Sequence, residues 1–136
     1  METSKGDIVV ELLINETPLS VANFISLIRQ GFYTNKSFHR VVQNFVAQGG
    51  CPRGDGWGSS PDLIRSEFTQ RGYETGVLGL ASAGKDTESC QWFFTHCPTP
   101  HLDGRYTIFG KIIIGQYVID QLEIGDKIKK IEVLDN

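Results

Sequence analysis

The sequence predicts a mainly β fold, in which seven or eight short strands form a barrel or a sandwich and two amphipathic helices cap its open ends. Glycine is frequent, with 15 among 136 residues, and glycine-rich turns separate many short apolar segments. Two other segments carry apolar residues at helical spacing instead. The length favours a single domain that spans residues 1–136.

The first part of the chain predicts a strand and then the longer helix. Residues 7–13 are mostly apolar and are typical of a strand. Residues 16–30 predict a helix, because Pro18 suits a first helical position and apolar residues recur at three- and four-residue steps from Val21 to Ile28. Gly31 stands where a glycine usually ends a helix.

The remaining predicted elements are shorter. We predict strands at residues 38–48, 77–81, 90–95, 107–111 and 128–134, and a short helix at 116–122. Residues 49–61 hold five glycines and two prolines, so they predict a long irregular loop that is functional or packed. Trp57 either fixes this loop or, as we expect, is an exposed or half-buried packing residue. Lys129 and Lys130 are expected on a solvated strand face.

Composition excludes several classes of protein. A net charge of -3 and a pI near 5.5 leave no basic patch, so we expect no nucleic-acid partner. No apolar run is long enough to span a membrane, and no signal-peptide pattern is present. The three cysteines lack CxxC spacing and fit free thiols in a reducing compartment. We therefore expect a cytoplasmic protein, or a periplasmic one if this is a domain cut from a longer exported chain.

Arg40 is the first candidate functional residue. It lies between Phe38 and Phe45, and an arginine among aromatic residues is costly to bury without a task. If residues 38–48 form one unbroken strand, Gln48 shares a face with Arg40. A permanent cation, an amide and apolar bulk together suit an uncharged ligand that has a carbonyl or amide to polarise. We interpret this stretch as one wall of a ligand groove.

Other motifs predict no cofactor. Residues 79–85 match the phosphate-binding pattern GxxxxGK, but Asp86 stands where Ser or Thr must hold magnesium, and its carboxylate would repel phosphate. The small residues 81–83 more plainly predict a ledge for an extended peptide. The histidines and cysteines match no zinc spacing, and Cys97 has no nucleophile signature. His39 is expected to be a packed, hydrogen-bonded structural residue.

Several motifs, in one order along nearly the whole chain, resemble the cyclophilin family. They occupy residues 38–42 with 45–50, residues 81–84 with 89–94, and residues 102–104 with 109–111. Residues 6–8, 22–24 and 31–33 match as well. Independent motifs in the right order make the resemblance specific, and the chain is most similar to the short bacterial and small eukaryotic members.

The resemblance implies a closed eight-stranded antiparallel β-barrel with a helix at each end, a packed interior and an external ligand groove. It implies peptidyl-prolyl cis-trans isomerase activity, with Arg40 as the catalytic residue and no cofactor. The residues that it implies for substrate binding are Phe45, Val46, Gln48, Ala81, Ser82, Gln91, Phe93, His101, Leu102 and Tyr106. Of these, the resemblance implies that Phe45, Val46, Phe93 and Leu102 line the proline pocket.

Four positions depart from the commonest family pattern. Val46 replaces a usual methionine, Ser82 an asparagine, His101 a tryptophan and Tyr106 a histidine. We expect weak cyclosporin binding because of His101. The expected partners are proline-containing peptides and unfolded proteins, bound by a monomer whose isomerase activity assists folding. The alternative is a proline-peptide binding module of a larger assembly that needs little turnover.

Overall fold

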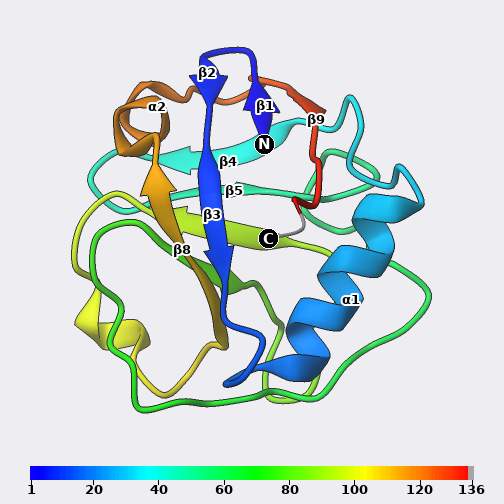
Figure 1. The fold of residues 1–136 in the computed structure, drawn as a ribbon, viewed down its shortest axis with the longest axis vertical. Coiled ribbons are helices and arrows are strands. Elements are labelled where there is room, and N and C mark those ends of the chain that lie inside the picture. Colours follow the sequence, from blue (N-terminus) through cyan, green and yellow to red (C-terminus); the bar gives the residue numbers. More distant parts are fainter. Residues whose placement is uncertain (135–136) are drawn as a thin grey trace.

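The computed structural model describes residues 1–134, and within them it has nine strands, two α-helices and one 3-10 turn (Figure 1). The strands are β1 (Glu2–Thr3), β2 (Gly6–Asp7), β3 (Val9–Leu12), β4 (Phe38–Val42), β5 (Val46–Gly49), β6 (Val77–Leu80), β7 (Trp92–Thr95), β8 (Ile108–Ile114) and β9 (Ile128–Lys130). The helices are α1 (Pro18–Arg29) and α2 (Gln116–Gln121), and the 3-10 turn is η1 (Pro100–Leu102).

The strands form a closed antiparallel barrel. Six of them hydrogen-bond in the order β3-β8-β6-β7-β5-β4, and the other three in the order β2-β1-β9. Only Ile8 separates β2 from β3, so these two act as one strand that belongs to both sheets. The two sheets also meet between β9 and the residues just before β4. There Ser37 pairs with Lys127, and the Ile128 amide donates to the Lys36 carbonyl at 2.8 Å. With β2 and β3 counted together, the eight-stranded barrel that the resemblance implied is confirmed among the described residues.

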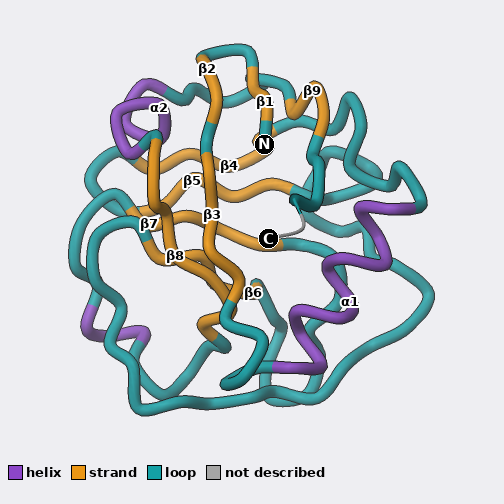
Figure 2. Tube along the Cα trace, viewed as in Figure 1, coloured by secondary structure: helices purple, strands orange, loops and turns teal. Residues whose placement is uncertain are grey.

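The barrel interior is filled by large apolar side chains. Trp92 is fully buried, and its ring lies 5.5 to 6.4 Å from four other aromatic rings, those of Phe24, Tyr33, Phe38 and Phe94. Figure 2 shows the strands in two crossing layers, with β3 and β8 running across β4, β5 and β7. Because the space between these layers is packed, a ligand site must lie on the outside of the barrel.

The two helices cover opposite sides of the strands (Figure 1). Helix α1 buries Val21, Phe24 and Leu27 against the core, as its helical spacing predicts, and α2 buries Val118 and Ile119. None of the helices among residues 1–134 has the length and apolarity to cross a bilayer.

The N-terminus of α1 is capped by a carboxylate from a distant loop. Thr17 occupies the N-cap position, but its hydroxyl donates backward to the Leu13 carbonyl at 3.1 Å and does not cap the helix. Glu67 instead accepts hydrogen bonds from the amides of Leu19 and Ser20 at 3.1 and 2.7 Å. The Ser20 hydroxyl donates to the same carboxylate at 2.6 Å. A negative charge at this end of the helix also interacts favourably with the helix dipole.

Two sequence predictions need correction. Residues 38–48 are not one strand but a hairpin, because a turn separates β4 from β5 and Asn44 adopts a left-handed φ of 61°. Asparagine tolerates this conformation better than most residues. The predicted strand at 128–134 ends at Lys130. The other predicted elements are present with shifted ends, and Lys129 and Lys130 are exposed as expected.

Candidate active site

A second apolar cluster lies outside the barrel core. In β7, Trp92 and Phe94 belong to the interior cluster, whereas Phe93 between them belongs to the outer one. The alternation of side chains along a strand explains this division. The outer cluster joins Phe93 and Val46 to partly buried side chains that come from loops, namely Phe45, Ala81, Leu102 and Tyr106. These are six of the predicted site residues, and the structure brings them together.

Phe93 forms the floor of this cluster. Its exposed fraction is 5%, and that of Val46 is 2%. The Tyr106 ring stands at 88° to the Phe93 ring with 6.1 Å between centroids. On its other side Phe93 stacks on Tyr73, at 5.7 Å and 19°. The cluster therefore offers a rigid apolar surface, as a binding site for a small ring requires.

Arg40 lies beside this surface on the β4–β5 hairpin. The register pairs Arg40 with Gln48, and a guanidinium nitrogen donates to Gln48 Oε1 at 3.5 Å. The guanidinium carbon lies 5.7 Å from the centroid of the Phe45 ring. Arg40 is exposed and forms no ion pair with any carboxylate among residues 1–134. Its charge is therefore available to a ligand.

A chain of amides connects Gln48 to the long loop. Gln48 Nε2 donates to Gln91 Oε1 at 3.1 Å. Gln91 Nε2 in turn donates to the carbonyls of Gly56 and Gly58, at 2.9 and 2.8 Å. Both predicted glutamines thus hold the irregular loop against the hairpin. Between the two carbonyls Trp57 is 84% exposed, so it does not fix the loop.

The remaining predicted residues form the opposite wall. The His101 ring stacks on Phe45 with centroids 5.5 Å apart and an angle of 27°. Ser82, His101, Leu102 and Tyr106 line one cavity of about 260 Å³. The Ala81 amide donates to the Gln91 carbonyl at 3.0 Å, which places the predicted ledge next to Gln91. All the predicted site residues therefore lie in one connected region.

His39 departs from its expectation. It is only half-buried, and its buried Nδ1 has no hydrogen-bond partner among the described residues, so the predicted hydrogen bond is absent from that atom. Burial lowers the pKa of His39, and the neighbouring Arg40 guanidinium lowers it further, so the neutral form is favoured. The part of the chain in residues 1–134 holds no group of three metal-ligating side chains, and all three cysteines are free thiols.

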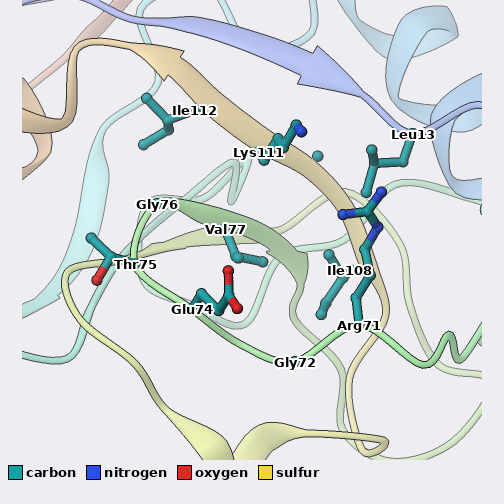
Figure 3. Close-up of a pocket in the computed structure, with 11 residues that line it drawn as sticks. Leu13, Arg71, Gly72, Glu74, Thr75, Gly76, Val77, Ile108, Lys111 and Ile112 are labelled. Carbon is teal, nitrogen blue, oxygen red and sulfur yellow. The ribbon is translucent and has the colours of Figure 1, made fainter.

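A cavity of about 220 Å³ lies apart from the predicted site (Figure 3). Arg71 and Lys111 line it, together with Glu74 from the loop before β6. Both cations are paired: the Arg71 guanidinium Nε lies 2.9 Å from each Glu16 carboxylate oxygen, and Lys111 lies 3.6 Å from Glu11. None of the residues that line this cavity was predicted to be functional.

Sequence reasoning missed the support beneath the pocket. Tyr73 stacks under Phe93 and donates its hydroxyl to the Thr107 carbonyl at 3.2 Å. Burial raises the pKa of Tyr73 far above its ordinary value, so this hydroxyl keeps its proton. Asp103 Oδ1 accepts the Tyr73 amide at 2.7 Å. Tyr73 is 30 residues from Asp103 in sequence, and no local pattern signals this pairing.

A packed barrel with an external apolar pocket and an unpaired guanidinium beside it is typical of a protein that binds peptides on its outer surface. The comparisons identify its family. Residues 1–135 match the family described as cyclophilin type peptidyl-prolyl cis-trans isomerase/CLD, and the chain belongs to this family. It is a cyclophilin-type peptidyl-prolyl cis-trans isomerase, as the sequence motifs indicated.

Named relatives and solved structures belong to the same family. The chain is 39% identical over 138 residues to a peptidyl-prolyl cis-trans isomerase of Helicobacter pylori strain J99, covering all of this chain and 83% of the relative. It is 42% identical over 125 residues to peptidyl-prolyl cis-trans isomerase B of Bacillus subtilis, covering 90% of this chain and 87% of the relative. A cyclophilin-type isomerase of Cryptosporidium parvum superposes with a TM-score of 0.93 at 30% identity, covering 100% of this chain and 96% of that one. A second structure of that protein, determined with the dipeptide Ala-Pro, gives a TM-score of 0.94 at 30% identity and covers 98% of that chain.

Proposed function

We propose that Arg40 is the residue that catalyses isomerisation in this chain. An X-Pro bond rotates over a barrier of about 18–20 kcal/mol because rotation breaks amide resonance. In the twisted state the proline nitrogen becomes pyramidal and gains a lone pair. A guanidinium that donates to this nitrogen stabilises the twisted state more than the planar one, which lowers the barrier without a covalent step. The unpaired guanidinium of Arg40 beside the outer apolar cluster is the observation that supports this role.

The apolar cluster would bind the proline ring. Phe45, Val46, Phe93 and Leu102 are the pocket residues in this proposal, with His101 and Tyr106 at its edge. A proline ring seated on the buried Val46 and Phe93 would exclude water from the reacting bond, and a drier site would strengthen the hydrogen bond from Arg40. The rigid stack of Phe93 on Tyr73 supports a fixed position for the ring.

The amides and the ledge would hold the peptide backbone. Gln48 positions Arg40 directly, and Gln91 connects Gln48 to the loop carbonyls, so both can keep the guanidinium oriented. The small residues Ala81 and Ser82 leave room for an extended chain next to Gln91. Guanidinium suits the catalytic task because its charge is permanent and its donors are rigid.

The Arg40→Ala variant tests the proposal. We expect kcat/KM on a short X-Pro peptide, measured by NMR exchange, to fall by about 10²–10³, as after loss of one preorganised donor. The fold should persist because Arg40 is exposed. Arg29→Ala, an exposed arginine at the end of α1, is the matched control and should retain activity. Activity of Arg40→Ala close to that of the unaltered protein would rule out this mechanism.

We also propose that the substrates are proline-containing segments of unfolded proteins and that the protein acts as a monomer in the cytoplasm, where three free thiols stay reduced. Size-exclusion chromatography tests the monomeric state, and cell fractionation tests the location in the cytoplasm. Weak cyclosporin binding remains our prediction, because His101 stacks on Phe45 where many members have tryptophan. A cyclosporin titration of the isomerase activity measures it.

A further inference from the structure

The cavity beside the predicted pocket contains two residues to which the isomerase reaction gives no role. Ser82, His101 and Tyr106 contribute to it, and these belong to the predicted groove. Lys85 and Arg105 also line it, and they come from two different loops. A peptide lying along the ledge at Ser82 would therefore pass directly beside an ammonium and a guanidinium group.

Both cations lack an acidic partner. Among residues 1–134, neither Lys85 nor Arg105 forms an ion pair, and the lining of this cavity includes no acidic residue. The separate cavity in Figure 3 is the contrast, because its Arg71 and Lys111 are paired with Glu16 and Glu11. The chain as a whole carries a net charge of -3, so the positive charge in the groove cavity is a local feature.

The carboxylates nearest in sequence are bound elsewhere. Asp86, next to Lys85, accepts the Ser66 amide at 2.9 Å, and its own φ is 64°. Asp103, two residues before Arg105, accepts the Tyr73 amide at 2.7 Å. Each acidic side chain therefore contributes to the structure of its loop and forms no ion pair with the neighbouring cation.

The loop that carries Lys85 is held in a tight turn. The Thr87 hydroxyl accepts the Ala83 amide at 2.8 Å and donates to the Gly84 carbonyl at 2.7 Å. The loop that carries Arg105 is closed by a hydrogen bond that the Arg105 amide donates to the Leu102 carbonyl at 3.1 Å. These turns fix the backbone from which each cation extends, which reduces the entropy lost when an anion binds.

We propose that this cavity binds an acidic side chain of the substrate, so that the enzyme prefers X-Pro segments with Asp or Glu a few residues from the proline. The inference rests on the proposed peptide groove. An unpaired cation pair in a recess selects a carboxylate over the isosteric amide. Exposed charge pairs are individually weak, so the expected preference is about three- to tenfold in kcat/KM.

The test uses pairs of peptides that differ only in Glu or Gln at one position, from two residues before the proline to three after it. For the unaltered protein we expect a Glu-to-Gln ratio of kcat/KM of about three to ten at one of these positions. The ratio should fall toward one in K85A/R105A and in high salt, since salt screens exposed charges. The double variant R29A/K129A removes the same net charge at exposed positions outside the groove and should keep the ratio.

The outcomes separate this proposal from the one on which it rests. A ratio at or below one at every position, with the Gln peptides still turned over, overturns the acidic preference and leaves the isomerase site intact. A raised ratio that persists in K85A/R105A also overturns it, because another feature then recognises the acid. Absence of turnover for all peptides in the unaltered protein would refute the proposed groove itself, and the preference with it.

Discussion

Glu67 caps α1 from a loop 47 residues away from Ser20, so its removal should weaken the whole barrel end that α1 covers. In Glu67→Ala the Leu19 and Ser20 amides and the Ser20 hydroxyl lose their acceptor. Ser20 is fully buried, so water cannot readily replace the carboxylate there. An unsatisfied buried donor costs about 1–3 kcal/mol, and loss of the favourable charge at the helix end about 0.3–1 kcal/mol.

We therefore expect the free energy of unfolding to fall by about 2–3 kcal/mol. For a chain of 136 residues, the usual entropy of unfolding converts this to a decrease in Tm of about 7–10 °C. Calorimetry and urea denaturation measure the two quantities. Glu67→Gln should lose less, because the amide retains one acceptor oxygen.

Glu123→Ala is the matched control, since the Glu123 side chain is exposed and makes no hydrogen bond or ion pair with the described residues. Its unfolding free energy should change by less than about 0.5 kcal/mol. If Glu67→Ala changed as little as Glu123→Ala, the carboxylate would not be the cap, and the reasoning from buried donors would be refuted.

Two further predictions concern buried groups. Burial raises the pKa of Glu88 above its ordinary value of 4.5, so the folded state holds this proton more tightly than the unfolded state. The contribution of Glu88 to stability should thus be fully present below pH 4.5 and be lost as the pH rises through the folded pKa. Thermal melts of Glu88→Gln and the unaltered protein across this range should therefore differ in their dependence on pH, and identical pH profiles would exclude this contribution. Gly50→Ala should cost about 3 kcal/mol or more in urea denaturation, because φ is 89° and the added Cβ would lie 2.6 Å from the Cys90 carbonyl oxygen. Gly31→Ala, with φ of 71° and no atom within 4 Å, should cost only about 1–2 kcal/mol, and equal costs would show that the close contact is unimportant.

The proximity of the candidate site residues could be predicted because these residues lie in local motifs. Arg40 and Gln48 share a face in an unbroken strand, and they share one in the observed hairpin as well, since they are directly paired across it. The prediction of one strand was wrong, yet the expected proximity of Arg40 and Gln48 was right. Residues 42–46 contain no glycine or proline, so Asn44 was the one local sign of the turn.

The features that could not be predicted from the sequence depend on contacts between residues that are distant along the chain. Strand β1 has only two residues, and it is a strand because β2 and β9 supply partners on both sides. Glu67 and Tyr73 lie in a segment without regular structure, and their partners are 47 and 30 residues away. Neither hydrophobic periodicity nor turn composition contains this information, which arises only when the barrel closes.

The closing seam of the barrel also determines how the protein reaches its own folded state. Ser37 pairs with Lys127, and Glu2 pairs with Lys130, so the final ring of hydrogen bonds joins segments separated by 90 residues or more along the chain. Contacts of such high sequence separation slow folding, because the entropy of a long loop must be lost before the pairing forms. During synthesis the ring cannot close until β9 has left the ribosome. A peptidyl-prolyl isomerase of this fold therefore has a late, long-range step in its own folding.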